Sequence, residues 1–248
     1  MNSIGIMLFI AIDPERGYIL GIADKSKYYP GSMILTVSDL SNAETIDHII
    51  GKLLISLGIN MNFSPVLDPN HKPKYPVKGI RGYSDKPEIV SKFEIEVIKS
   101  KQSEGIIATG KHFPGHRDVE KDSQRGLLVL SFDKERLYYM ELKPFIAAID
   151  NGLKNIMVVH IIFLEFDEEN PTTVSKDIIK EILRDELNYT WLITSDCMEM
   201  SAISVIITSP VGVLIGIKAG VYLVLDCYTR KRQVDSINQL KFNIENNF

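Results

Sequence analysis

Side chains capable of acid–base or nucleophilic chemistry follow the short apolar runs of this sequence. Asp13 follows the first run, Lys111 and His112 follow the third, His160 ends the fourth, and Asp196 follows the fifth. A carboxylate can attack an electrophilic carbon or move a proton, and lysine and histidine can bind polar substrate groups. Because the carboxyl ends of parallel strands converge on one face in α/β barrels, this pattern favours a shared site.

Each of these residues also has a structural explanation, which the sequence leaves open. Asp13 and Asp68 could each cap a turn or a helix, as a single aspartate commonly does. His160 could be a hydrogen-bonded histidine of the core. Asp196 could be the N-cap of a helix over residues 198–203.

The apolar runs and the amphipathic stretches between them predict alternating strands and helices. The runs are short and rich in β-branched or bulky residues, as buried parallel strands are. Pro87 suits a first helical turn, and Ser175 suits an N-cap. The alternation predicts an α/β fold of parallel βαβ units, although a barrel and a doubly wound sheet fit it equally well. The expected strands cover residues 7–12, 61–66, 105–109, 155–160, 191–194 and 221–225, and the expected helices cover residues 43–57, 87–101, 134–151, 175–187, 211–219 and 230–243.

Length and composition exclude several classes of protein. The 248 residues carry a net charge of -4, which provides no basic surface for nucleic acid. Two cysteines are too few for a disulfide framework or a four-thiolate zinc site. No run approaches the roughly 20 apolar residues that span a bilayer, and the start lacks the basic region of an export signal. We therefore expect no membrane span, a cytoplasmic location and a single domain over residues 1–248.

Several motifs occur in one consistent order along the chain. Residues 111–116 read K-H-F-P-G-H, residues 194–200 read T-S-D-C-M-E-M, and residues 62–68 read N-F-S-P-V-L-D. Together they resemble the motifs of glycoside hydrolase family 3, in its β-N-acetylhexosaminidase type. Further segments resemble that family at residues 13–17, 80–84, 141–145 and 170–175.

The resemblance implies both a fold and an activity. It implies a TIM-like (β/α) barrel, here N-terminally shortened because the chain starts at what resembles the family's second strand. It also implies a retaining glycoside hydrolase that releases terminal β-linked N-acetylglucosamine from cell-wall muropeptides or chitooligosaccharides. Such a mechanism uses two side-chain groups and a carbohydrate substrate, and it requires no metal or organic cofactor.

The resemblance also implies roles for particular residues. Asp196 occupies the nucleophile position, and Asp122 the position that orients a general acid/base two residues later. The positions that bind the sugar are occupied by Asp13, Arg81, Lys111, His112 and His160.

One position departs from the family in a way that affects the chemistry. Gln124 stands where the family has its acid/base histidine, and a neutral amide has no titratable proton near neutral pH. General acid–base catalysis contributes roughly 10²–10⁴-fold, so we expect weakened hydrolysis of natural substrates. The alternative is a catalytically impaired protein that binds sugars or muropeptides. An unrelated α/β enzyme for phosphorylated substrates is disfavoured, because no P-loop or G-x-G-x-x-G motif occurs.

Overall fold

The computed structural model describes residue 5 and residues 8–15, 31–36, 39–70, 81–116 and 126–246. It divides the chain into two compact units, which are described separately. The first unit comprises residues 1–118 and 139–155, and the second comprises residues 119–138 and 156–248. The expectation of a single domain over residues 1–248 therefore stays a prediction.

The first unit contains a parallel sheet with strand order β1-β2-β3. Strand β1 (Ala11–Ile12) pairs with β2 (Met61–Asn62), which pairs with β3 (Ile107–Phe113). A bridge between Val66 and Lys111 joins the chain beyond β2 to the end of β3. The end of β3 therefore lies beside the segment that follows β2.

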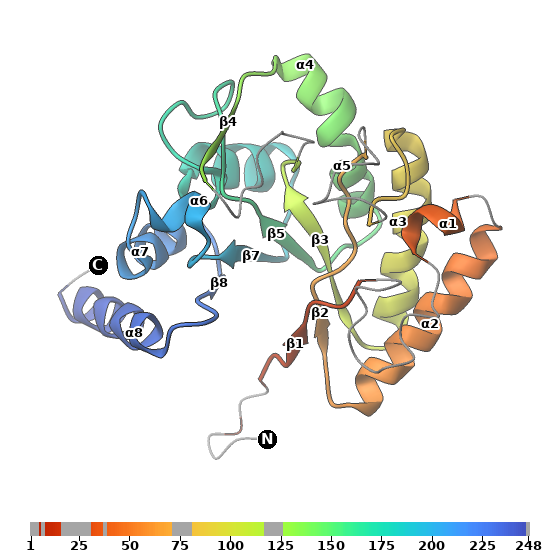
Figure 1. Ribbon diagram of the computed structural model, residues 1–248, viewed down its shortest axis with the longest axis horizontal. Helices are drawn as coiled ribbons and strands as arrows, with labels where there is room; N and C mark the ends of the chain where they lie inside the picture. The colour runs from red at the N-terminus through yellow and green to blue at the C-terminus, as the bar shows by residue number, and fades with distance from the viewer. Residues whose placement is uncertain are drawn as a thin grey trace. The chain divides into compact units, whose positions relative to one another are not determined.

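Two long helices of this unit, α2 (Leu40–Ser56) and α3 (Pro87–Ser103), lie side by side (Figure 1). Helix α3 begins at Pro87, where the missing N–H would have no partner within the helix. It buries Val90, Phe93 and Val97, whose spacing places them on one helical face. The shorter helices are α1 (Ser32–Leu35) and α5 (Lys143–Asp150).

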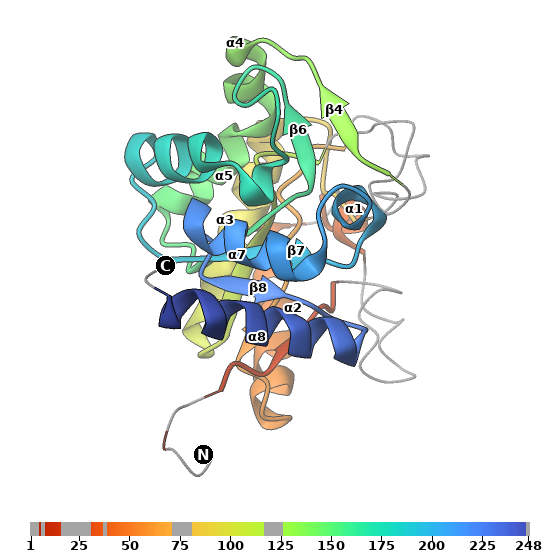
Figure 2. The same cartoon turned by 90° about the vertical axis from the view of Figure 1, so that its left-hand side faces the viewer.

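The second unit contains strands in the order β5-β7-β8 and a separate parallel pair, β4 and β6. Helices α7 and α8 of this unit pack against each other (Figure 2). The strands are β4 (Leu128–Leu130), β5 (Asn155–Val158), β6 (Ile161–Phe163), β7 (Leu192–Cys197) and β8 (Leu223–Leu225). The first residue of β5, Asn155, is counted with the first unit. The helices are α4 (Lys134–Arg136), a 3-10 turn (Thr172–Val174), a π-helix (Asp177–Glu186), α6 (Ser201–Ser204), α7 (Ser209–Ala219) and α8 (Arg230–Glu245).

The parallel α/β class expected from the sequence is confirmed, with some corrections. Strands β4 and β6 were not expected, and of the described residues 8–12 in the strand expected at residues 7–12, only those of β1 form a strand. The single helix expected over residues 134–151 is wrong. It is divided into α4, a π-helical turn (Leu137–Glu141) and α5, because Pro144 lacks the N–H needed inside a helix and instead begins a new one. Among the described residues, no helix is both long and apolar enough to cross a bilayer.

A glycine inside β3 predicts one effect on stability. A Cβ atom added to Gly110 would lie 2.6 Å from the Leu67 side chain and 2.7 Å from that of Leu153. Gly110→Ala should therefore lower the free energy of unfolding by about 1–3 kcal/mol, through overpacking. The matched control is Gly126→Ala, where the added atom meets nothing within 4 Å. Urea unfolding of both variants measures the difference, and equal stabilities would contradict the prediction.

Candidate functional site

A cluster of opposite charges lies at the end of β3 in the first unit. The Lys111 side chain is only 1% exposed, and its ammonium lies 2.5 Å from Asp13 Oδ1 and 3.0 Å from Glu15 Oε1. Asp13 differs from its partners, since 59% of its side chain is exposed. The buried Lys111 therefore holds a carboxylate that itself faces solvent.

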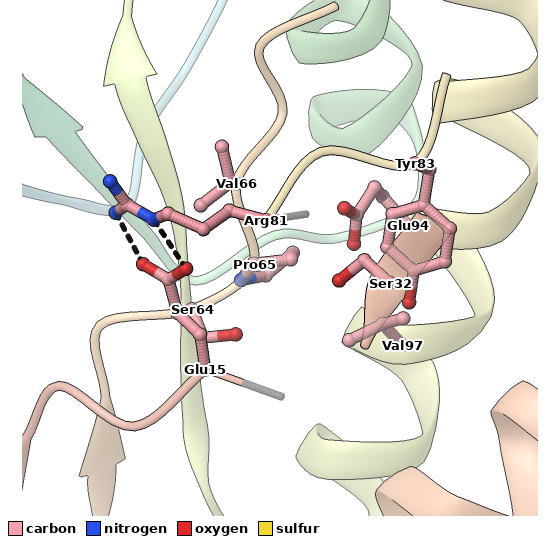
Figure 3. Close-up of a pocket in the computed structure, with 9 residues that line it drawn as sticks. All are labelled: Glu15, Ser32, Ser64, Pro65, Val66, Arg81, Tyr83, Glu94 and Val97. Carbon is pink, nitrogen blue, oxygen red and sulfur yellow. Dashed lines mark hydrogen bonds and ion pairs between the residues drawn. The ribbon is translucent and has the colours of Figure 1, made fainter. Parts of the chain in front are cut away.

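Arg81 joins the same cluster through Glu15 (Figure 3). Its Nε donates to Glu15 Oε2 at 2.6 Å, and its Nη2 donates to Glu15 Oε1 at 2.5 Å. This two-bond geometry fixes the plane of the guanidinium group, because both hydrogen bonds must form together. Glu15 therefore orients Arg81 and contacts Lys111 with the same carboxylate.

Every pKa shift in this cluster favours the charged form. Burial by itself would raise the pKa of Glu15, but the Lys111 charge and the Arg81 hydrogen bond hold it at about 2. Burial by itself would lower the pKa of Lys111, but the charges of Glu15 and Asp13 raise it above its ordinary value. Glu15 and its two cationic partners thus keep each other ionised at neutral pH.

Glu15 and Arg81 also line a hollow of about 220 Å³. Figure 3 shows Ser32, Tyr83 and Glu94 on the side of the hollow opposite the ion pair. This volume includes space open to solvent, and the enclosed part, about 10 Å³, has room for roughly one water molecule. The hollow as it stands therefore does not accommodate a sugar ring.

The Asp68 carboxylate holds the K-H-F-P-G-H segment, residues 111–116, in place. Its carboxylate accepts hydrogen bonds from the amides of His116, at 2.6 Å, and His112, at 3.3 Å, and lies 2.9 Å from His112 Nδ1. Gly115 in this segment has a φ of +150°, and an added Cβ atom would lie 2.7 Å from Glu141. The segment thus curves around the buried Asp68 carboxylate. At Gly115 both the backbone conformation and the nearby Glu141 side chain favour glycine.

In the second unit, Asp196 lies at an irregularity between β7 and β8. Thr194 pairs with Leu223, and Cys197 pairs with Leu225, so β7 has one more residue than β8 between these pairs. Such a bulge redirects side chains and is common next to active sites. Helix α6 begins only at Ser201, so the alternative of Asp196 as an N-cap over residues 198–203 is wrong.

His160 is completely buried in the same unit. Its Nδ1 lies 2.7 Å from Thr173 Oγ1, and its Nε2 lies 3.0 Å from the Cys197 carbonyl oxygen. This geometry matches the core histidine that the sequence left open. A direct contact of His160 with substrate stays a prediction.

Sequence comparison adds a decisive observation to this geometry. The model of the "Glycosyl hydrolase family 3 N terminal domain" matches residues 1–247. The chain belongs to glycosyl hydrolase family 3.

Relatives in family 3 agree in fold and in sequence. A family 3 β-N-acetylglucosaminidase from Paenibacillus sp. str. FPU-7 has a TM-score of 0.93 and 37% identity, over 97% of this chain and 46% of that one. This similarity confirms the expected TIM-like α/β fold class. Beta-hexosaminidase A of Pseudoalteromonas piscicida is 33% identical over 79% of this chain and 36% of its own length. The beta-hexosaminidase of Nitrosomonas eutropha is 31% identical over 79% of this chain and 58% of its own. This family 3 chain therefore spans less than two thirds of either enzyme.

The structure groups the expected site residues of this family 3 chain by unit. The first unit brings together Asp13, Arg81 and Lys111. His112, the residue after Lys111 in the chain, contacts Asp68. In the second unit, Asp196 and His160 meet at Cys197, since the Cys197 amide donates to Asp196 Oδ1 at 2.7 Å and its carbonyl faces His160. Asp122 and Gln124 lie outside the described residues, so their expected roles stay predictions.

Sequence reasoning missed Glu15, although it lies inside the D-P-E segment that resembles the family. The signal available was a second carboxylate two residues after Asp13. Its burial and its contact with two cations depend on distant parts of the chain, which no local pattern shows.

The shifted pKa of Glu15 predicts that part of the stability is sensitive to acid. The pKa is about 2 in the folded chain against an ordinary 4.5, so folding favours the charged form. The corresponding contribution is about 3 kcal/mol. It is fully present above pH 4.5 and is lost as the pH falls toward 2. Urea unfolding across this pH range measures the loss.

Glu15→Gln tests the same cluster at neutral pH. The variant leaves the charges of Lys111 and Arg81 without their shared carboxylate, so stability should fall by about 3–5 kcal/mol. Glu44→Gln, at an exposed position of α2, is the matched control and should change stability by less than about 0.5 kcal/mol. Equal stability of Glu15→Gln and the parent would show that the cluster does not support the fold.

Proposed function

We propose that this chain carries the catalytic machinery of a retaining β-N-acetylhexosaminidase. An Asp196 carboxylate oxygen attacks the anomeric carbon of a terminal β-linked N-acetylglucosamine, while the bond from that carbon to the leaving oxygen breaks. Water then attacks the same carbon, which releases the sugar and regenerates the carboxylate. The substrates proposed are cell-wall muropeptides or chitooligosaccharides.

The observation that carries this proposal is the position of Asp196 in a chain matched by the family model over residues 1–247. Asp196 lies one residue before the end of β7, in the bulge opposite β8. Ser195 Oγ accepts a hydrogen bond from the Leu225 amide at 2.9 Å, which fixes the bulge from the side of β8. A nucleophile needs this kind of fixed placement, because small displacements sharply reduce the rate.

The charge cluster of the first unit supports the same function. Sugar hydroxyl groups are well recognised by charged partners, which form stronger hydrogen bonds than neutral groups. Asp13 is the member most open to solvent, and Lys111 holds one of its oxygens. In the proposal Asp13, Arg81 and His112 contact hydroxyl groups, while the buried Lys111 holds the Asp13 carboxylate in place.

Gln124 favours a second candidate function, a sugar-binding protein with little or no hydrolysis. A leaving oxygen that receives no proton departs slowly, and an amide cannot supply that proton. The two functions differ most for substrates whose leaving group needs no protonation. A hydrolase should turn over such activated substrates, whereas a protein that only binds sugars should not.

A covalent adduct at Asp196 is the direct test of the nucleophile. Incubation with an activated 2-deoxy-2-fluoro glucoside, in which fluorine replaces the 2-acetamido group, should add one sugar mass to the protein, and peptide mapping should locate it at Asp196. Asp196→Ala should form no adduct, whereas Asp185→Ala, an exposed aspartate of the same unit, should react like the parent. An adduct that persists in Asp196→Ala would exclude this role.

Restoring the histidine at position 124 tests the acid/base assignment. Gln124→His should raise hydrolysis of an unactivated glycoside by roughly 10²–10⁴-fold, with a much smaller effect on an aryl glycoside that has a good leaving group. Gln124→Asn retains an amide and should behave like the parent. No gain with histidine, from a protein that still forms the Asp196 adduct, would refute the assignment of position 124.

A further inference from the structure

The only two cysteines of this sequence lie on neighbouring segments of the second unit. Cys197 is the last residue of β7 and is opposite Leu225 in the register with β8. Cys227 follows two residues after Leu225. The Met198 amide donates to the Leu225 carbonyl at 2.8 Å, so the two segments stay together beyond the paired residues.

Glu199 ties the same two segments together further along the chain. One of its carboxylate oxygens accepts hydrogen bonds from the amides of Tyr228, at 2.5 Å, and Thr229, at 2.8 Å. The cysteines therefore lie within a stretch that is linked before and after them. These contacts hold the two segments that carry the cysteines next to each other.

The two thiols lie near enough to change each other's ionisation. Interaction with the Cys227 thiol lowers the pKa of the Cys197 thiol to about 7, against an ordinary 9.0, and the same interaction raises the pKa of Cys227. Cys197 is buried, whereas Cys227 is exposed. One cysteine thus has thiolate character near neutral pH, and its neighbour opens the pair to solvent.

We propose that Cys197 and Cys227 form a dithiol site that hydrogen peroxide oxidises to an intramolecular disulfide. The Cys197 thiolate attacks one peroxide oxygen, so the O–O bond breaks and a sulfenic acid and hydroxide form. The Cys227 thiol then attacks the Cys197 sulfur, the S–S bond forms, and the hydroxyl group leaves as water with the Cys227 proton. Two thiols are oxidised to one disulfide, and one peroxide is reduced to two waters.

Oxidation at this position affects the residue next to Cys197 in the chain. The Cys197 amide donates to Asp196 Oδ1 at 2.7 Å, so a bond that moves Cys197 also moves the carboxylate. A disulfide has narrow limits on its dihedral angles and on the separation of its Cβ atoms. This consequence rests on the function proposed for Asp196, whereas the formation of the disulfide does not.

Intact-mass measurement of the full chain tests the disulfide directly. Treatment of the reduced protein with hydrogen peroxide should remove the mass of two hydrogens and abolish N-ethylmaleimide labelling of the unfolded product, and dithiothreitol should restore both. Cys227→Ser, at the exposed position, should lose no hydrogens and should keep Cys197 open to labelling or to oxygen addition. A parent that keeps two labelled thiols, gains oxygen at Cys227 alone, or links two chains would overturn the proposal.

The effect on Asp196 is measured separately with the activated 2-fluoro sugar. The oxidised parent should lose at least tenfold in the rate of adduct formation, whereas peroxide-treated Cys227→Ser whose mass shows no added oxygen should react at the same rate as before treatment. An oxidised parent that reacts as fast as the reduced one would remove the effect on Asp196. If the reduced parent forms no adduct, the proposed function fails, and the mass measurement still decides whether the disulfide forms.

Discussion

A lysine ammonium group that is almost completely withdrawn from water is the strongest physical constraint in this structure. Transfer of an isolated charge from water into a protein interior costs several kcal/mol unless partners replace its hydration. For Lys111 those partners are Asp13 and Glu15, and Glu15 is in turn neutralised by Arg81. The residues that follow β1, the residues that precede α3 and the end of β3 must therefore meet at one point of the first unit.

A second buried carboxylate, that of Asp68, also contacts several groups at once. Asp68 organises the segment that follows Lys111 by accepting two backbone amides and facing the His112 ring. A carboxylate that accepts several hydrogen bonds can replace the regular pairing that an irregular segment lacks. In the second unit, Glu199 has the same relation to the amides of Tyr228 and Thr229. Irregular segments next to the candidate catalytic residues are thus fixed by single buried or half-buried acids.

The sequence predicted the elements whose pattern reflects burial, and it missed those that depend on distant contacts. Helices α2 and α3 were predicted because their apolar spacing is helical over more than four turns. Strands β4 and β6 have three residues each, too few to show a period, and they pair only with each other. In the candidate site, motifs identified Asp13, Arg81 and Lys111. The role of Glu15 and the two hydrogen bonds of His160 required the fold.

The charge cluster also bears on the choice between hydrolase and binding protein. Buried ion pairs are weak evidence for stability, since apolar residues of similar volume often stabilise a fold as well or better. Apolar residues in place of all four charged groups could therefore also support a fold, so stability alone does not explain two carboxylates and two cations here. A site that presents Asp13 to solvent on a buried lysine has a use in binding polar ligands, whether or not Gln124 permits rapid hydrolysis. Under the function proposed for this chain, sugar binding and catalysis are thus separable: the charge cluster would serve the first, and Asp196 with position 124 would decide the second.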